Sequence, residues 1–138
     1  MTEYSTQRIY EESRGQDGAR VLVDRIWPRG ISREDASLDH WAKSLAPSAE
    51  LRKWFDHRED RFEQFRTRYV QELKDAQEAQ EELDRLEQEQ KVTFLYAARD
   101  ESLNQAVVLA EYCRRRAAGQ QAAEQRGERG GSRSGAGS

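Results

Sequence analysis

Two short apolar runs constrain the fold of this chain more than any other feature of its sequence. Val21, Leu22 and Val23 are consecutive apolar residues, and Val92–Ala97 is a second run of β-branched and aromatic residues. Unbroken apolar character is typical of strands that are covered on both faces, as in parallel sheets flanked by helices. The segment between the runs is long enough for a helical crossover, which favours parallel pairing. We therefore predict an α/β fold with a small, at least partly parallel sheet covered by helices.

The segment between the runs has the spacing of amphipathic helices. Ser32 is a suitable N-cap for a first helix that ends at Pro47, and Ser48 can cap a second, short helix. From about Asp60 to about Gln88, apolar residues recur every three or four positions, which predicts one long amphipathic helix. A capping box predicts a last helix that begins near Ser102. The apolar stripe of the first helix would be Leu38, Trp41, Ala42 and Leu45.

The chain has 138 residues, which corresponds to one domain rather than two. We expect residues 1–116 to form a single α/β domain. Beyond them, Gly, Ser, Arg and Gln dominate and no periodicity is present. We therefore predict that residues 117–138 form a disordered tail.

Composition excludes several classes of function. The net charge of −3 argues against a protein that coats nucleic acid, although it leaves room for a local basic site. A single cysteine, Cys113, and two histidines provide neither an internal disulfide nor a zinc site. No glycine-rich phosphate loop or dinucleotide fingerprint is present, so we predict no cofactor. No apolar run approaches the length of a membrane span, and no apolar leader opens the chain, so we expect a soluble cytoplasmic protein.

Charged and aromatic residues follow both apolar runs. If the two strands are parallel, their ends meet at one edge of the sheet, where open α/β sheets place their ligands. The residues expected to converge there are Asp24, Arg25, Trp27 and Arg29 after the first run, and Tyr96, Arg99, Asp100 and Asn104 at the end of the second.

These residue types suit an anionic ligand. Arginine side chains match the paired oxygens of phosphate and carboxylate, so Arg25, Arg29 and Arg99 are predicted to hold the anion. The candidate catalytic groups are Asp24 and Asp100, which could act as acids, bases or orienting groups. The remaining predicted ligand contacts are an aromatic wall of Trp27 and Tyr96 and the side-chain amide of Asn104.

The same residues also have structural explanations. Acids and arginines at strand ends often pair with one another and hold loops, and Asp100 is well placed to cap a helix. His57 could reach the site as a general base, but a solvated or capping histidine is the favoured interpretation. Binding of nucleic acid through Arg114–Arg116 and the tail is not favoured, because glutamates interrupt the basic charge of the tail.

Three groups of residues in this order resemble the YeaO-like branch of the domain-of-unknown-function 488 family. The groups are Leu22–Gly30, Leu45–Ser48 with Leu51–Phe55, and Leu95–Asp100 with Asn104 and Ala106. The resemblance covers roughly residues 6 to 116. It implies a small α/β domain of bacteria and archaea, and it implies no reaction, cofactor or catalytic residue.

Two functions from different classes are compatible with these observations. The first is an enzyme that acts on a phosphorylated small molecule, a nucleotide or a nucleic-acid end. The alternative is a non-catalytic binding or regulatory module for an anionic ligand or a protein partner, which the missing nucleophile and metal set favour. The substrate, the reaction type and the oligomeric state are not determined by the sequence.

Overall fold

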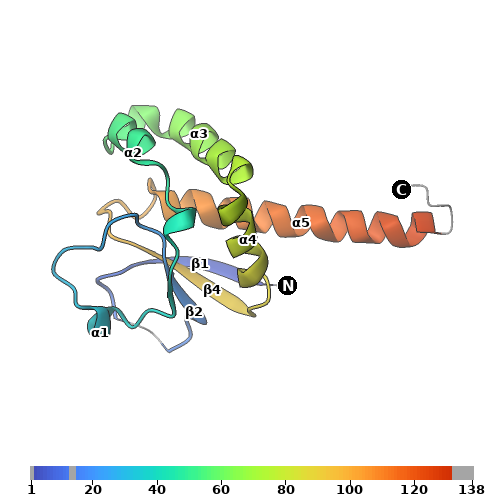
Figure 1. Cartoon of the computed structure of the whole chain (residues 1–138), viewed down its shortest axis with the longest axis horizontal. Helices are drawn as coiled ribbons and strands as arrows, with labels where there is room; N and C mark the ends of the chain where they lie inside the picture. Colours follow the sequence, from blue (N-terminus) through green and yellow to red (C-terminus); the bar gives the residue numbers. More distant parts are fainter. Residues whose placement is uncertain (1, 13–14, 132–138) are drawn as a thin grey trace.

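A parallel sheet forms the centre of the molecule (Figure 1). The computed structural model describes residues 2–12 and 15–131, of which 120–131 are described by their backbone alone. Within this part of the chain the strand order is β1-β4-β2-β3, and every neighbouring pair is parallel. The prediction of an α/β fold with a parallel sheet is confirmed. The strands are β1 (Glu3–Arg8), β2 (Ala19–Leu22), β3 (His40–Trp41) and β4 (Lys91–Tyr96).

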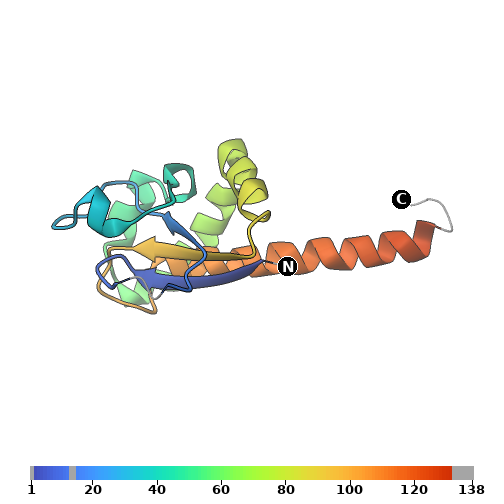
Figure 2. The ribbon, with the colours of Figure 1, turned by 90° about the horizontal axis from the view of Figure 1, so that it is seen from below.

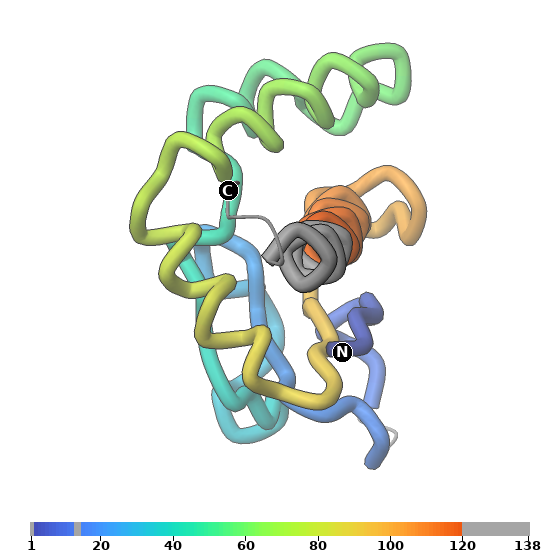
Figure 3. The backbone as a smooth tube through the Cα atoms, turned by 90° about the vertical axis from the view of Figure 1, so that its right-hand side faces the viewer, coloured from blue at the N-terminus to red at the C-terminus, as the bar shows by residue number. Residues whose placement is uncertain are grey.

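Helices cover one face of the sheet, and the longest of them runs across it. Figure 3 looks along α5 and shows α3 on one side of this helix and β1 on another. Accordingly, α5 packs against β1, β4 and α3. The helices are α1 (Arg33–Ala36), α2 (Ala49–Phe55), α3 (Phe62–Asp75), α4 (Gln77–Leu86) and α5 (Gln105–Gly131), with short 3-10 turns η1 (Lys43–Leu45) and η2 (Glu59–Arg61).

The sheet is buried on both faces, as its apolar runs predict. Val21 and Val23 belong to the large core beneath α2, α3, α4 and α5, whereas Leu22 packs on the opposite face against Ala36 of α1 and Leu95 of β4. The side chains of Val21, Leu22 and Val23 are completely inaccessible to solvent. Because successive side chains of a strand point to opposite faces, an unbroken apolar run requires a cover on each side.

The first predicted helix is much shorter than its apolar spacing indicates. α1 ends at Ala36, Ser37 has a φ of 50°, and the chain then extends into β3 beside β2. The buried Arg20 explains this ending, because its guanidinium donates to the carbonyl oxygens of Ala36 (2.9 Å) and Ser37 (3.1 Å). Those contacts satisfy helix-terminal carbonyls. Trp41 therefore belongs to a strand and not to a helical stripe.

The single long helix predicted over residues 60–88 is two helices. Ala76 has φ −94° and ψ 111°, an extended conformation that separates α3 from α4. α3 packs against α2 and α5, while α4 packs against η1 and binds His40 through Glu82. We attribute the break to these two sets of contacts, because α3 and α4 pack against different elements.

α5 begins slightly later than the sequence predicts. It begins at Gln105, because Asn104 caps the backbone N–H of Val107 at 3.0 Å. Its backbone is helical to Gly131 (Figure 1), and the boundary predicted between the domain and a disordered tail at residues 116 and 117 stays a prediction. The frequent Ala, Gln, Glu and Arg residues of this segment favour a helix without packing. Residues 132–138 lie outside the described part of the chain. None of the described helices has the length and apolar character needed to span a bilayer.

Figure 2 shows the last part of α5 extending beyond the sheet and the other helices. The site described below lies at the opposite end of α5, where this helix begins.

Candidate functional site

The ends of β2 and β4 lie side by side, as the sequence predicts. Leu22 is the register partner of Leu95, and the backbone N–H of Val23 donates to the Leu95 carbonyl at 3.0 Å. One residue further on, the Asp24 carboxylate accepts a hydrogen bond of 3.1 Å from the backbone N–H of Ala97. The two predicted junctions therefore form one edge of the sheet, with Asp24 connecting them.

A cleft of about 830 Å³ opens at this edge of the sheet. Its walls come from the loop after β2, the segment that contains α2, the loop after β4 and the start of α5. Its apolar lining includes the largely buried Pro47, Phe55, Phe65 and Leu103, and its exposed cations are Arg25, Arg52, Lys53 and Arg99. The cleft thus has apolar walls and a basic rim.

Three acidic residues line the cleft, and Asp24 is the least exposed of them, since Asp56 and Asp100 are exposed. It is half-buried, and its second carboxylate oxygen accepts a hydrogen bond from the Gln105 side chain. Burial raises the pKa of the Asp24 carboxyl from 3.8 to about 6, against the opposing effects of the Ala97 hydrogen bond and the positive charge of Arg52. A carboxyl group with this pKa changes its charge near neutral pH, and such groups are concentrated at functional sites.

The cations of the rim differ in how strongly they are held. The Nε of Arg25 donates to the Pro47 carbonyl at 3.2 Å, which fixes the position of its guanidinium. Among the described residues, Lys53 and Arg99 have no hydrogen-bond or ion-pair partner. Their charged groups are therefore available to an incoming anion.

Asp100 and Asn104 line the cleft, but their side chains hold the loop before α5. The Asp100 carboxylate accepts hydrogen bonds from the backbone N–H groups of Ser102 (2.8 Å) and Leu103 (2.9 Å), which lower its pKa. Asn104 donates to the Asp100 carbonyl at 2.8 Å and caps α5. Asp100 therefore holds the loop rather than capping α5, which Asn104 does, and a catalytic role for Asp100 stays a prediction.

The other three predicted ligand contacts, Trp27, Arg29 and Tyr96, do not line the cleft. Tyr96 still belongs to β4, so its side chain is buried in the core below the helices. Trp27 donates to the Ile31 carbonyl at 2.8 Å and packs edge-to-face on Trp41 on the opposite face of the sheet. The backbone of Arg29 is held away from the cleft by the Tyr10 hydroxyl, which donates to the Arg29 carbonyl at 2.7 Å.

Comparison with known proteins gives the family. Residues 3–130 match the model of a family described as the inactive DUF488-N3 subclade. The chain belongs to this DUF488 family. The resemblance found in the sequence is therefore confirmed.

Several relatives of this DUF488 protein are similar over most of their length. An uncharacterised protein of Mycobacterium tuberculosis and one of Mycobacterium bovis are each 44% identical over 110 residues, which covers 80% of this chain and 92% of theirs. The uncharacterised protein YeaO of Escherichia coli is 40% identical over 108 residues, covering 78% of this chain and 94% of its own. No solved structure matches the chain.

Sequence reasoning missed four polar residues that this DUF488 domain brings to the cleft: Arg52, Lys53, Asp56 and Gln105. It considered His57, which does line the cleft with an exposed side chain. Asp56 and His57 both have positive φ, 48° and 54°, which turns the chain sharply after α2. No glycine marks this turn, so the sequence alone gives no signal that α2 lies above the strand ends.

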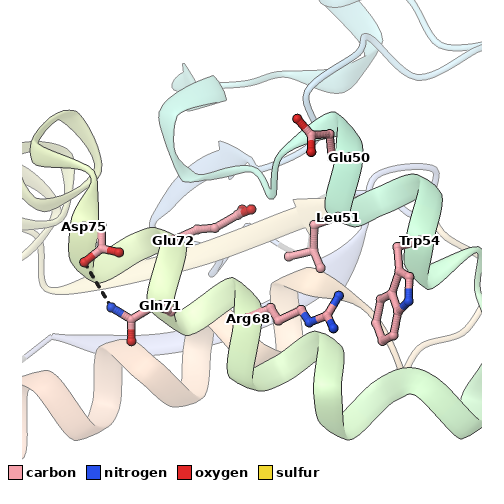
Figure 4. Close-up of a pocket in the computed structure, with 7 residues that line it drawn as sticks. All are labelled: Glu50, Leu51, Trp54, Arg68, Gln71, Glu72 and Asp75. Carbon is pink, nitrogen blue, oxygen red and sulfur yellow. Dashed lines mark hydrogen bonds between the residues drawn. The ribbon is translucent and has the colours of Figure 1, made fainter.

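A second, smaller pocket lies between α2 and α3 (Figure 4). It measures about 430 Å³, and most of its polar side chains already have partners, such as Gln71, which donates to Asp75 at 3.0 Å. Arg68 lies over the Trp54 ring at 4.3 Å, and Glu72 accepts hydrogen bonds from the backbone and hydroxyl of Ser48 at 2.9 and 2.6 Å. These contacts join α2 to α3, so we interpret this pocket as structural. Among the side chains described, those of residues 2–12 and 15–119, no group of three acidic, histidine or cysteine residues is placed to hold a metal ion.

Proposed function

We propose that the cleft at the ends of β2 and β4 binds a small organic anion without transforming it. The observation that carries this proposal is the arrangement of exposed cations above apolar walls. Lys53 and Arg99 offer charged groups that have no partner among the described residues, and Arg25 is held beside them. Apolar walls with a few convergent polar groups are typical of small-molecule sites, and the cations favour an anion over a neutral ligand.

Two further observations support binding rather than catalysis. The subclade that the chain matches is described as inactive. In addition, both oxygens of Asp24 already accept hydrogen bonds, from Ala97 and Gln105, so this carboxylate is held in place within the fold. A binding module needs no nucleophile or metal, and the cleft supplies what such a module requires.

An enzyme acting on a phosphorylated small molecule or nucleotide is the second candidate. One observation favours it, namely that burial raises the pKa of Asp24 to about 6. A general acid or base works best when its pKa lies near the operating pH. In this case Asp24 would exchange protons with a substrate whose anionic group is held by Arg99. A cytoplasmic location also stays a prediction from the sequence.

Thermal stabilisation by ligands tests the anion site. We expect phosphate, nucleotides or small carboxylates to raise the melting temperature of the unaltered protein, because a ligand that binds only the folded state stabilises it. The variant Arg99→Ala should lose most of this rise. Arg29→Ala is the matched control, because Arg29 is equally exposed but lies outside the cleft. An equal rise in Arg99→Ala, or a loss confined to Arg29→Ala, would place the anion elsewhere.

Turnover separates the two candidate functions. Each compound that stabilises the protein is incubated with it and followed by phosphorus NMR or chromatography. A binding module gives saturable stabilisation and no product. A product that accumulates with the unaltered protein but not with Asp24→Asn would establish the enzyme instead.

A further inference from the structure

We infer that the ligand of this cleft is a nucleoside phosphate, whose phosphate meets the basic rim while hydrogen-bond donors of its base or ribose meet Asp24. This inference rests on the proposed anion binding and makes it more specific. It follows from the different exposure of the cationic side chains, the apolar side chains and Asp24, which all line the cleft.

Four exposed cations and two exposed acids, Asp56 and Asp100, line the cleft, so the excess of charge at its mouth is positive. Arg52, Lys53 and Arg99 have exposed side chains, whereas Phe55 and Phe65, which line the same cleft, are only 6% and 2% exposed. A phosphate group held by these cations would therefore remain close to solvent. The space below it is lined by aromatic and aliphatic side chains and suits the less polar body of an organic molecule.

The Asp24 carboxylate favours a ligand that has a hydrogen-bond donor in addition to its anionic group. It is half-buried, and it accepts one hydrogen bond on each oxygen, from Ala97 and from Gln105. An ionised carboxylate has about four acceptor positions, so part of its capacity remains for a ligand. A carboxylate repels a phosphate and attracts N–H or O–H groups. The anionic part of the ligand is thus directed to the rim, and a hydrogen-bond donor is directed inward.

The dimensions of the cleft agree with a ligand of this kind. Small-molecule sites commonly enclose about 300–1,000 Å³, and the cleft of about 830 Å³ lies within that range. Inorganic phosphate would occupy only the rim and leave the apolar walls and Asp24 without contacts. A nucleotide combines the required features, because it has a phosphate, a planar ring that packs on apolar walls, and several N–H and O–H donors.

Isothermal titration calorimetry near neutral pH tests the inference with three kinds of probe. The probes are the four common ribonucleoside monophosphates, phenyl phosphate and inorganic phosphate. Phenyl phosphate has an anion and an aromatic ring but no donor on its ring. We expect at least one nucleotide to bind about tenfold more tightly than phenyl phosphate, which corresponds to one well-made hydrogen bond to a charged group.

Two variants test which residues cause the preference for a nucleotide over phenyl phosphate. Asp24→Asn should reduce the preference for the nucleotide over phenyl phosphate to less than about threefold. Arg99→Ala should weaken the binding of both compounds and leave the ratio of their dissociation constants unchanged, because Arg99 contacts only the phosphate group that both compounds share. Arg29→Ala again serves as the control, and the melting temperature of each variant shows that it is folded.

The possible failures are distinguishable. If phenyl phosphate binds as tightly as every nucleotide, or if Asp24→Asn keeps the full preference, the inference is wrong and anion binding stands. If none of the phosphate compounds binds the unaltered protein, the inference is overturned. The proposed anion site is overturned as well if small carboxylates also fail to raise the melting temperature.

Discussion

Among single residues, Asp24 lies in the candidate site and has a pKa that its surroundings change strongly. The side chain follows a fully buried strand and connects the ends of β2 and β4 through Ala97. In the unfolded chain its pKa would be close to 3.8, and in the folded protein it is about 6. The folded state therefore holds the proton more tightly. This carboxyl contributes its full stability below about pH 4 and loses it as the pH rises to about 6.

The variant Asp24→Asn should consequently stabilise the protein at neutral pH. The side-chain oxygen of asparagine can still accept from the Ala97 N–H, and no charge is buried. We expect the free energy of unfolding to rise by about 1–3 kcal/mol, the upper value being the full pKa difference. Urea unfolding measured from pH 4 to pH 8 checks this. The unaltered protein should lose stability between about pH 4 and pH 6 relative to the variant, and parallel profiles would contradict the expectation.

Arg20 is a buried cation whose donors are engaged on several sides. It is 6% exposed and pairs with Asp17 at 2.5 Å, in addition to its contacts with the end of α1. We expect Arg20→Met to lower the free energy of unfolding by about 3–5 kcal/mol, because Asp17 remains buried without its arginine. Arg58→Met is the control, since the pair of Arg58 with Asp60 is exposed and should contribute less than about 1 kcal/mol. Similar losses in the free energy of unfolding for Arg20→Met and Arg58→Met would contradict the expectation that the buried pair contributes more than the exposed one.

At the scale of elements, the break between α3 and α4 gives a test that a continuous helix would fail. Ala76 is the N-cap of α4, and it has no side-chain oxygen to offer. We expect Ala76→Ser to raise the free energy of unfolding by about 0.5–1 kcal/mol, because serine caps the first turn. At the exposed helical position Lys74, a serine should instead cost a few tenths of a kcal/mol. A lower free energy of unfolding for serine at both positions, measured in urea, would indicate one uninterrupted helix.

The start of β2 depends on a close approach to β4. Gly18 has a φ of 64°, and a Cβ atom there would lie 2.3 Å from the carbonyl oxygen of Lys91. Gly18→Ala should therefore destabilise the protein by more than about 2 kcal/mol, since a backbone atom must move. Gly30 has a similar φ of 79° but open space around it, so Gly30→Ala should cost only about 1–2 kcal/mol of backbone strain. Equal losses of stability in Gly18→Ala and Gly30→Ala, measured by thermal unfolding, would show that backbone strain and not contact with Lys91 causes most of the loss.

At the scale of the whole molecule, the sheet and the first part of α5 form the packed body. The described buried side chains of α5 lie between Ala106 and Cys113, and Arg116 binds Asp84 (2.6 Å) and Glu87 (2.5 Å). The backbone beyond them extends away from the sheet (Figures 1 and 2).

Removal of residues 120–138 should therefore leave the fold intact. We expect the melting temperature to change by less than about 2 °C, because the contacts described above all precede residue 120. Gel filtration of the same variant shows whether the oligomeric state depends on this segment. A fall of more than about 5 °C, or a changed state of assembly, would mean that the distal part of α5 has a partner.

The sequence by itself determined the features that local pattern controls. Val21–Val23 are consecutive apolar residues, Val92–Tyr96 is a run of β-branched, aliphatic and aromatic residues, and burial on both faces follows from the alternation of side chains along a strand. Parallel pairing then brought Asp24 and Arg99 to one edge of the sheet. The anionic ligand inferred from the composition of that edge stays a prediction.

The tertiary structure decided the features that depend on contacts between distant residues. The end of α1 is set by Arg20, and the helix break at Ala76 carries no glycine or proline to announce it. Arg52 reaches the cleft only because α2 packs above the strand ends, while the loop that carries Arg29 turns away from them. Periodicity shows that a side chain is buried, but it does not show against which element. The direction of each loop, and with it the membership of the site, is therefore fixed only when the whole chain packs.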